Sequence, residues 1–192
     1  MLASTAARDA LIDNMMKAAE DYGFDGWNVD FESLSAQTGV HFVQFIKELS
    51  IRCRENGLIL SVDNYIPASY NRFYDLNTQG KFVDYVIIMA YDEHYSGSPV
   101  AGSVSSLGFL KSAVENTLEL VPKERVVIGI PFYTRLWSEQ TVDGEIKVSS
   151  EALTMNGAAD VLERRDIVPW WDETTSQNYA EYTQGDITYK IW

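Results

Sequence analysis

The chain has 192 residues, a formal net charge of −13 and a hydrophobic content of 46%, with 12% aromatic residues. This hydrophobic content is enough for a sizeable folded core and excludes a disordered acidic tail. The negative charge argues against nucleic acid or an anionic membrane surface as a partner, because phosphate groups are bound by basic surfaces. No apolar run approaches the length of a membrane span, and residues 1–13 lack the pattern of a secretory signal. We therefore expect no nucleic-acid partner and no membrane insertion.

The residues that most often bind metals are few. The single cysteine, Cys53, excludes an internal disulfide and a cysteine-based zinc site, and its helix-like surroundings predict a buried, inert thiol. The two histidines, His41 and His94, do not have a metal-ligand spacing. His94 is expected to be a loop histidine without a role, the alternative being a position in a cleft. We expect neither a metal nor a cofactor.

Strands and helices are expected to alternate along the first two thirds of the chain. Four apolar segments predict strands, at 24–31, 58–64, 85–91 and 126–131. Helical spacing of apolar residues predicts helices over 5–22, 40–56 and 107–121. The very apolar third strand is expected to be buried on both faces, and the segments around Pro67 and over 96–103 are expected to be loops. This alternation is typical of parallel βαβ units and of the α/β fold class.

The pattern changes near the C-terminus. Asp143-Gly144 predicts a hairpin turn, and residues 150–165 predict one helix. The aromatic stretch 170–192 alternates like antiparallel strands, with a turn at Gln184-Gly185. We therefore expect two parts, the βα units over 1–137 and a small α+β insertion over 138–192.

The strand expected over 24–31 is followed by an acid and carries polar residues on one face. Because side chains alternate across a strand, Asn28, Asp30 and Glu32 are expected to share that face. An ordinary half-buried strand also alternates in this way. In a parallel sheet, however, both faces are usually covered, and a buried polar row is tolerated where a cleft or an active site needs it.

Two carboxyl groups so close together do not ionise independently. Their like charge and any burial raise the pKa of one of them, which leaves a carboxylic acid able to donate a proton near neutral pH. Cleavage of a glycosidic bond needs such a donor at the leaving oxygen.

Three motifs follow one another along the chain, at residues 25–32, 89–92 and 129–137, and they resemble those of glycoside hydrolase family 18, the chitinases and their relatives. The signature D-G-x-D-x-D-x-E of that family is matched at Asp25, Gly26, Asn28, Asp30 and Glu32. Residues 89–92, Met-Ala-Tyr-Asp, are similar to its M-x-Y-D motif, and residues 129–137 are similar to its G-x-P-x-Y-x-R-x-W motif. The resemblance spans roughly residues 5–192 and is strongest to the bacterial branch that acts on spore cortex and cell wall.

The resemblance implies strands four to seven of a (β/α)8 barrel, followed by the insertion. It also implies substrate-assisted retaining cleavage of β-1,4 bonds at N-acetylglucosamine, in peptidoglycan or chitin, in which the acetamido oxygen of the sugar is the nucleophile. Glu32 would be the acid and base, Asp30 would orient the acetamido group, and Tyr91 would donate a hydrogen bond to its oxygen.

Further residues are implied as substrate contacts. They are Asp25, Asn28, Asp92, Tyr133 and Arg135. Asn28 departs from the aspartate that is usual in chitinases, which puts the pH optimum and the proton relay in question. The alternative for Tyr91 is a core aromatic residue, and the alternative for Arg135 is a surface ion pair.

A complete barrel of this kind takes about 250 residues, so strands one to three and eight are expected outside this chain. Two open sheet edges and an uncovered face predict self-association, most simply as a two-fold dimer, or completion by the missing strands. We expect little or no hydrolase activity from this chain alone. Two alternatives stay open, a carbohydrate-binding relative that turns nothing over and a fragment whose role is assembly. By resemblance the location is extracellular, cell wall or spore.

Overall fold

The structure is a computed structural model that describes residues 1–192. The chain forms two compact units, the first made of residues 1–89 and 113–129 and the second of residues 90–112 and 130–192. The division expected at residues 137 and 138 stays a prediction. No helix combines the length and the apolar character needed to cross a membrane.

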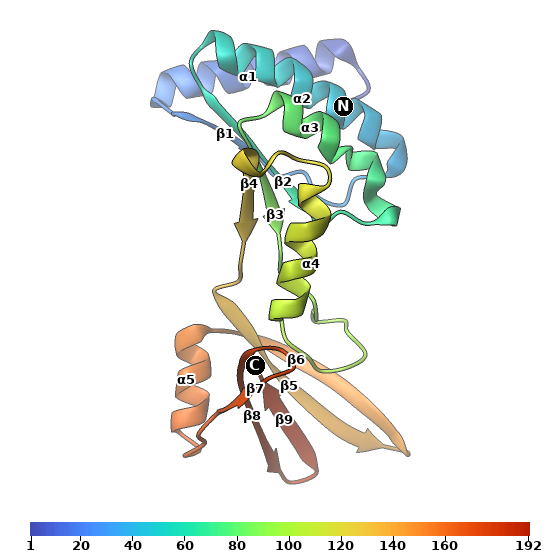
Figure 1. Cartoon of the computed structure of the whole chain (residues 1–192), viewed down its shortest axis with the longest axis vertical. Helices are drawn as coiled ribbons and strands as arrows, with labels where there is room; N and C mark the ends of the chain where they lie inside the picture. The colour runs from blue at the N-terminus through green and yellow to red at the C-terminus, as the bar shows by residue number, and fades with distance from the viewer. The chain divides into compact units, whose positions relative to one another are not determined.

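The first unit contains a parallel sheet of four strands (Figure 1). The strands are β1 (Gly26–Val29), β2 (Ile59–Tyr65), β3 (Tyr85–Met89) and β4 (Val126–Gly129), in the spatial order β1-β2-β3-β4. Helical segments connect them: α2 (Ala36–Glu55) follows β1, while η1 (Ser69–Tyr74) and α3 (Leu76–Phe82) follow β2. The expected α/β class is confirmed, and β1 and β4 are the two open edges of the sheet.

The remaining helical segments that contribute to this unit are α1 (Thr5–Tyr22), part of α4 (Leu107–Leu118) and η2 (Lys123–Arg125). Ser4 caps α1 and Ser35 caps α2, each with its side chain accepting a backbone hydrogen bond from the first turn. Gly23 ends α1 in the left-handed region, at φ 68°, where glycine has no steric penalty.

The core lies between the helices and one face of the sheet. Val62, Val86 and Ile88 from the strands are fully buried there, together with Phe42 and Leu49 from α2. This burial removes apolar surface from water and is the main force that holds the unit together.

The opposite face of the sheet is partly exposed, which corrects one expectation. In β3, Val86 and Ile88 are buried, but Tyr85 is 43% exposed and Ile87 is half-buried. The strand is therefore covered on one face, not on both. Cys53, in α2, is buried as expected, and burial raises the pKa of its thiol to about 11.

Three strands are shorter than the sequence predicted, among them β4, which ends at Gly129 and not at Pro131. β1 ends at Val29, so Asp30 and Glu32 lie beyond its paired residues, and β3 ends at Met89, before Tyr91. The expected loop after Pro67 also contains η1 and α3. Asp75 is the N-cap of helix α3. It adopts a φ of 49°, and its side chain accepts a hydrogen bond from the Thr78 backbone N–H at 3.1 Å.

The second unit contains an antiparallel sheet with the order β6-β5-β9-β8-β7. Its strands are β5 (Tyr133–Val142), β6 (Glu145–Thr154), β7 (Trp170–Asp172), β8 (Gln177–Gln184) and β9 (Ile187–Ile191). The hairpin turn at Asp143-Gly144 is confirmed between β5 and β6. The other turn lies at residues 185–186, one position later than expected.

The helix expected over 150–165 is shorter, because its first part belongs to a strand. β6 pairs with β5 as far as Thr154, and α5 runs only over Met155–Glu163. Thr154 marks the change, since its hydroxyl accepts a hydrogen bond from the Gly157 backbone N–H at 3.0 Å and caps the helix.

Candidate active site

A second row of polar side chains, on β2, lies beside the polar row that begins on β1. Asn28 lies opposite Ser61 in the parallel register. The Ser61 hydroxyl donates to Asn28 Oδ1 at 2.7 Å, and Asn28 Nδ2 donates to Asp63 Oδ2 at 2.7 Å. These two bonds fix which way the amide of Asn28 points.

Asp30 and Glu32 follow the end of β1, and both are exposed. The pKa of Asp30 is raised by partial burial and then by the negative charges of Asp63 and Glu32. The sequence predicted a raised pKa for one member of the acid pair. In the structure the pKa of Asp30 is raised. One cause of the raised pKa is the charge of Asp63, which lies outside the sequence motifs.

Glu32 has a direct partner on β2. The Tyr65 hydroxyl donates to Glu32 Oε2 at 2.9 Å, and the same hydroxyl accepts the Ser33 backbone N–H at 3.2 Å. Ser33 has a φ of 55°, in the left-handed region that non-glycine residues seldom adopt. The acid that is expected to donate the proton is therefore held next to a sharp turn.

Sequence reasoning missed the three polar residues on β2, namely Ser61, Asp63 and Tyr65. A signal was present, because they alternate with Leu60, Val62 and Asn64, all of them buried. Only the register between β1 and β2 shows that this second row lies beside the first.

In the second unit the structure brings together three of the expected site residues. The Tyr133 hydroxyl donates to Asp92 Oδ1 at 2.6 Å, and the ring of Tyr91 meets the ring of Tyr133 edge to face, with centroids 6.4 Å apart. Burial, and then the hydrogen bond to Asp92, raise the pKa of Tyr133.

Arg135 is not in a surface ion pair, which removes the alternative considered for it. Its Nη1 donates to Ser150 Oγ at 3.1 Å, and its buried Nε has no hydrogen-bond partner. Asp25 is exposed just before β1, where its backbone carbonyl accepts the Ile59 N–H at 2.9 Å. His94 lies in a loop, with Nδ1 2.9 Å from the Ser103 carbonyl.

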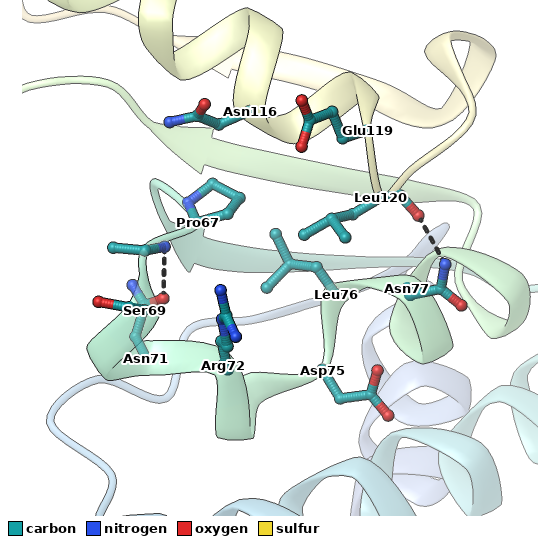
Figure 2. Close-up of a pocket in the computed structure, with 11 residues that line it drawn as sticks. Pro67, Ser69, Asn71, Arg72, Asp75, Leu76, Asn77, Asn116, Glu119 and Leu120 are labelled. Atoms are coloured by element: carbon teal, nitrogen blue, oxygen red, sulfur yellow. Dashed lines mark hydrogen bonds between the residues drawn. The ribbon is translucent and has the colours of Figure 1, made fainter.

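Two cavities have a size and a lining that bear on ligand binding. One, of about 480 Å³, lies among η1, α3 and the end of α4 (Figure 2). Most of its polar side chains, Arg72 and Glu119 among them, are exposed, and the acidic row does not line it. The other, of about 280 Å³, lies within the second unit and is lined by Tyr133, Trp171 and Asn178 among others.

A family model, described as glycosyl hydrolases family 18, matches residues 1–192. The chain belongs to this family. Its four parallel strands with helices and its antiparallel sheet thus form part of a barrel and an insertion.

Curated relatives of this chain include sporulation proteins. YdhD of Bacillus subtilis, which carries the provisional name sporulation-specific glycosylase, is 28% identical over 196 residues. The cortical fragment-lytic enzyme of Bacillus subtilis is 24% identical over 199 residues. Both alignments cover 100% of this chain and 46% of the relative. The chain thus spans about half the length of these relatives.

Solved structures agree with this fold. The crystal structure of YdhD superposes with a TM-score of 0.89 at 26% identity, covering 100% of this chain and 64% of that chain. A chitinase from Chromobacterium violaceum gives a TM-score of 0.85 at 26% identity, covering 97% of this chain and 59% of that one.

Proposed function

We propose that this chain carries part of the active site of a glycoside hydrolase that cleaves β-1,4 bonds at N-acetylglucosamine in peptidoglycan or chitin. The observation that carries the proposal is the acid pair Asp30 and Glu32, exposed beyond the end of a parallel strand. In barrels of this type the reacting groups lie at the carboxyl ends of the strands. Membership in family 18 supports a glycosidase role for this pair, and the names of the relatives support spore cortex or chitin as the substrate.

In the proposed mechanism Glu32 is the acid and base. It protonates the leaving oxygen while the acetamido oxygen of the sugar attacks its own anomeric carbon, and it then takes a proton from the water that opens the intermediate. Asp30 accepts a hydrogen bond from the acetamido N–H, and its negative form stabilises the positive charge of the intermediate. Tyr91 donates its hydroxyl to the acetamido oxygen.

Sugar binding is proposed for a second group of residues. Asp25, Asn28, Asp92, Tyr133 and Arg135 are the proposed contacts. The unpartnered Nε of Arg135 supports its assignment, because a buried N–H without an acceptor is costly and a ligand oxygen would satisfy it. The exposed indole of Trp171, beside Tyr133 in the smaller cavity, offers an apolar face to a sugar ring.

The test of this proposal compares sugars that differ in one group. A chromogenic oligomer of N-acetylglucosamine and the matching glucose oligomer are given to a longer form of the protein that completes the barrel. We expect cleavage of the first only, since glucose lacks the amide that acts as nucleophile. Efficient cleavage of the glucose oligomer would contradict the mechanism. Binding of the first oligomer without any cleavage would instead indicate a carbohydrate-binding relative.

A further inference from the structure

Two tyrosines hold the turn that carries Glu32. This turn, residues 31–34, makes hydrogen bonds to one hydroxyl from β2 and to another from η1. The Ser33 N–H donates to the Tyr65 hydroxyl at 3.2 Å, and the Leu34 N–H donates to the Tyr74 hydroxyl at 3.2 Å. The two rings pack edge to face, with centroids 5.8 Å apart.

The two hydroxyls donate hydrogen bonds to different acceptors. Tyr74 donates to the backbone carbonyl of Phe31 at 3.3 Å, so all of its hydrogen bonds are to the backbone. Tyr65 donates to the carboxylate of Glu32 at 2.9 Å. The hydroxyl of Tyr65 thus links the turn to the side chain of the proposed acid.

We propose that Tyr65 is a positioning residue for Glu32, which fixes the carboxyl group relative to the backbone that carries it. The inference rests on the proposed function, because it assigns a role within the same reaction. It goes beyond the motifs of the sequence, none of which includes Tyr65.

The physical reason lies in the freedom of an exposed glutamate. Three side-chain torsions separate a glutamate carboxyl group from its backbone, and an exposed carboxyl samples several rotamers. Glu32 is exposed and has no ion pair. The hydrogen bond from the Tyr65 hydroxyl holds one carboxyl oxygen of Glu32 in place and so favours one rotamer. Tyr65 is itself half-buried and packed against Tyr74, which restricts the motion of its ring.

Correct placement matters twice in the proposed reaction. Glu32 delivers a proton to the leaving oxygen and later takes one from water, and each transfer needs the carboxyl group within hydrogen-bond reach. A misplacement of about 1 Å can cost on the order of 100-fold in rate. Loss of the Tyr65 hydroxyl is therefore expected to lower kcat and to leave KM nearly unchanged, since Tyr65 positions the acid and is not proposed to bind the sugar.

The experiment compares Tyr65→Phe with its matched control Tyr74→Phe. Each substitution keeps the ring and removes one hydroxyl that accepts a backbone N–H from the same turn. The first readout is the rotamer distribution of Glu32 in this chain, from three-bond couplings measured by NMR, and it needs no substrate. The second is kcat and KM on the N-acetylglucosamine oligomer with the barrel-completing form.

We expect one dominant Glu32 rotamer in the wild type and in Tyr74→Phe, and averaging among rotamers in Tyr65→Phe. We also expect kcat to fall about 10- to 100-fold in Tyr65→Phe and much less in Tyr74→Phe. Averaged rotamers in the wild type, or equal effects of the two substitutions, would overturn the proposal. So would loss of the folded state in Tyr65→Phe alone, seen by circular dichroism, because it would indicate a purely structural role.

The two proposals fail in different ways. If the wild type cleaves nothing but Tyr65→Phe alone releases the Glu32 rotamer, the positioning role is supported and the hydrolase function is contradicted. If the wild type cleaves the oligomer and Tyr65→Phe changes neither kcat nor the rotamer, the hydrolase function is supported and the positioning role is contradicted.

Discussion

At the scale of residues, the amide of Asn28 connects two rows of polar groups. It accepts from Ser61 and donates to Asp63, so a carboxylate from β2 lies beside the acid pair that follows β1. Asp63 is one of the causes of the raised pKa of Asp30. A negative charge that Asn28 lacks is thus supplied from the neighbouring strand.

This arrangement predicts the effect of Asp63→Asn. Because a neighbouring negative charge disfavours ionisation of Asp30, its removal should lower the pKa of Asp30. The carboxyl carbon of Asp30, followed by NMR as the pH is changed, should then titrate at a lower pH than in the wild type. Ser61→Ala is the control, since it removes a neutral partner of Asn28 from the same row. An unchanged titration of Asp30 in Asp63→Asn would show that the charge of Asp63 does not act on it.

The residues of the acid pair could be found in the sequence, and their partners could not. Asp30 and Glu32 stand two apart in a recognisable motif, which is local information. Asp63 and Tyr65 lie 33 residues beyond them and come beside them only through the pairing of Asn28 with Ser61. That register depends on the packing of whole strands, which no short motif records.

At the scale of elements, an ion pair joins α1 to α2. Arg8 is 6% exposed, and it donates to both carboxylate oxygens of Glu48, at 2.7 and 2.9 Å. Gln44 donates to the same carboxylate at 2.8 Å. The hydrogen bond from Arg8 is the largest cause of a lowered pKa of Glu48, and the hydrogen bond from Gln44 lowers it further.

The lowered pKa predicts a loss of stability in acid. A carboxyl group whose pKa is lower in the folded state stabilises the protein fully above its unfolded pKa, about 4.3 for glutamate, and this contribution is lost as the pH falls through the lower folded value. Chemical unfolding at a series of pH values should show a weaker acid dependence in Glu48→Gln. Glu119→Gln, at an exposed position without an ion pair, is the control. The same acid dependence in Glu48→Gln and in the wild type would contradict the assignment.

The sequence predicted elements best where local signals and packing agree. The helix expected over 5–22 has those bounds in α1, because a serine cap and a glycine stop mark both ends. Over 150–165 the signals conflict. Residues 150–154 can continue a helical pattern, but pairing with β5 extends the hairpin through them as far as Thr154. Tertiary pairing decided the boundary there.

At the scale of the whole molecule, one face and two edges of the parallel sheet are free of helices in the first unit. On that face Ile59 is 50% exposed and Val127 is 41% exposed, and β1 and β4 have unpaired edges. Exposed apolar faces and open edges favour association. We therefore predict that this chain self-associates, most simply as a two-fold dimer.

Light scattering at micromolar concentration tests this prediction. We expect a dimer for the wild type and a larger monomer fraction for Ile59→Lys, because a charge on the open face disfavours its burial. Ile51→Lys is the matched control, since Ile51 is similarly exposed, at 52%, but lies on helix α2 and not on the open face of the sheet. A well-folded wild-type monomer would contradict the prediction.

Glu32 is the proposed proton donor, and one substitution tests this role most directly. Glu32→Gln keeps the shape of the side chain and removes the acid. In the form that completes the barrel, hydrolysis of the N-acetylglucosamine oligomer should fall by about 10²- to 10⁴-fold, with an unchanged circular dichroism spectrum. Retention of most of the activity by Glu32→Gln would place the proton donor at another residue and contradict the account.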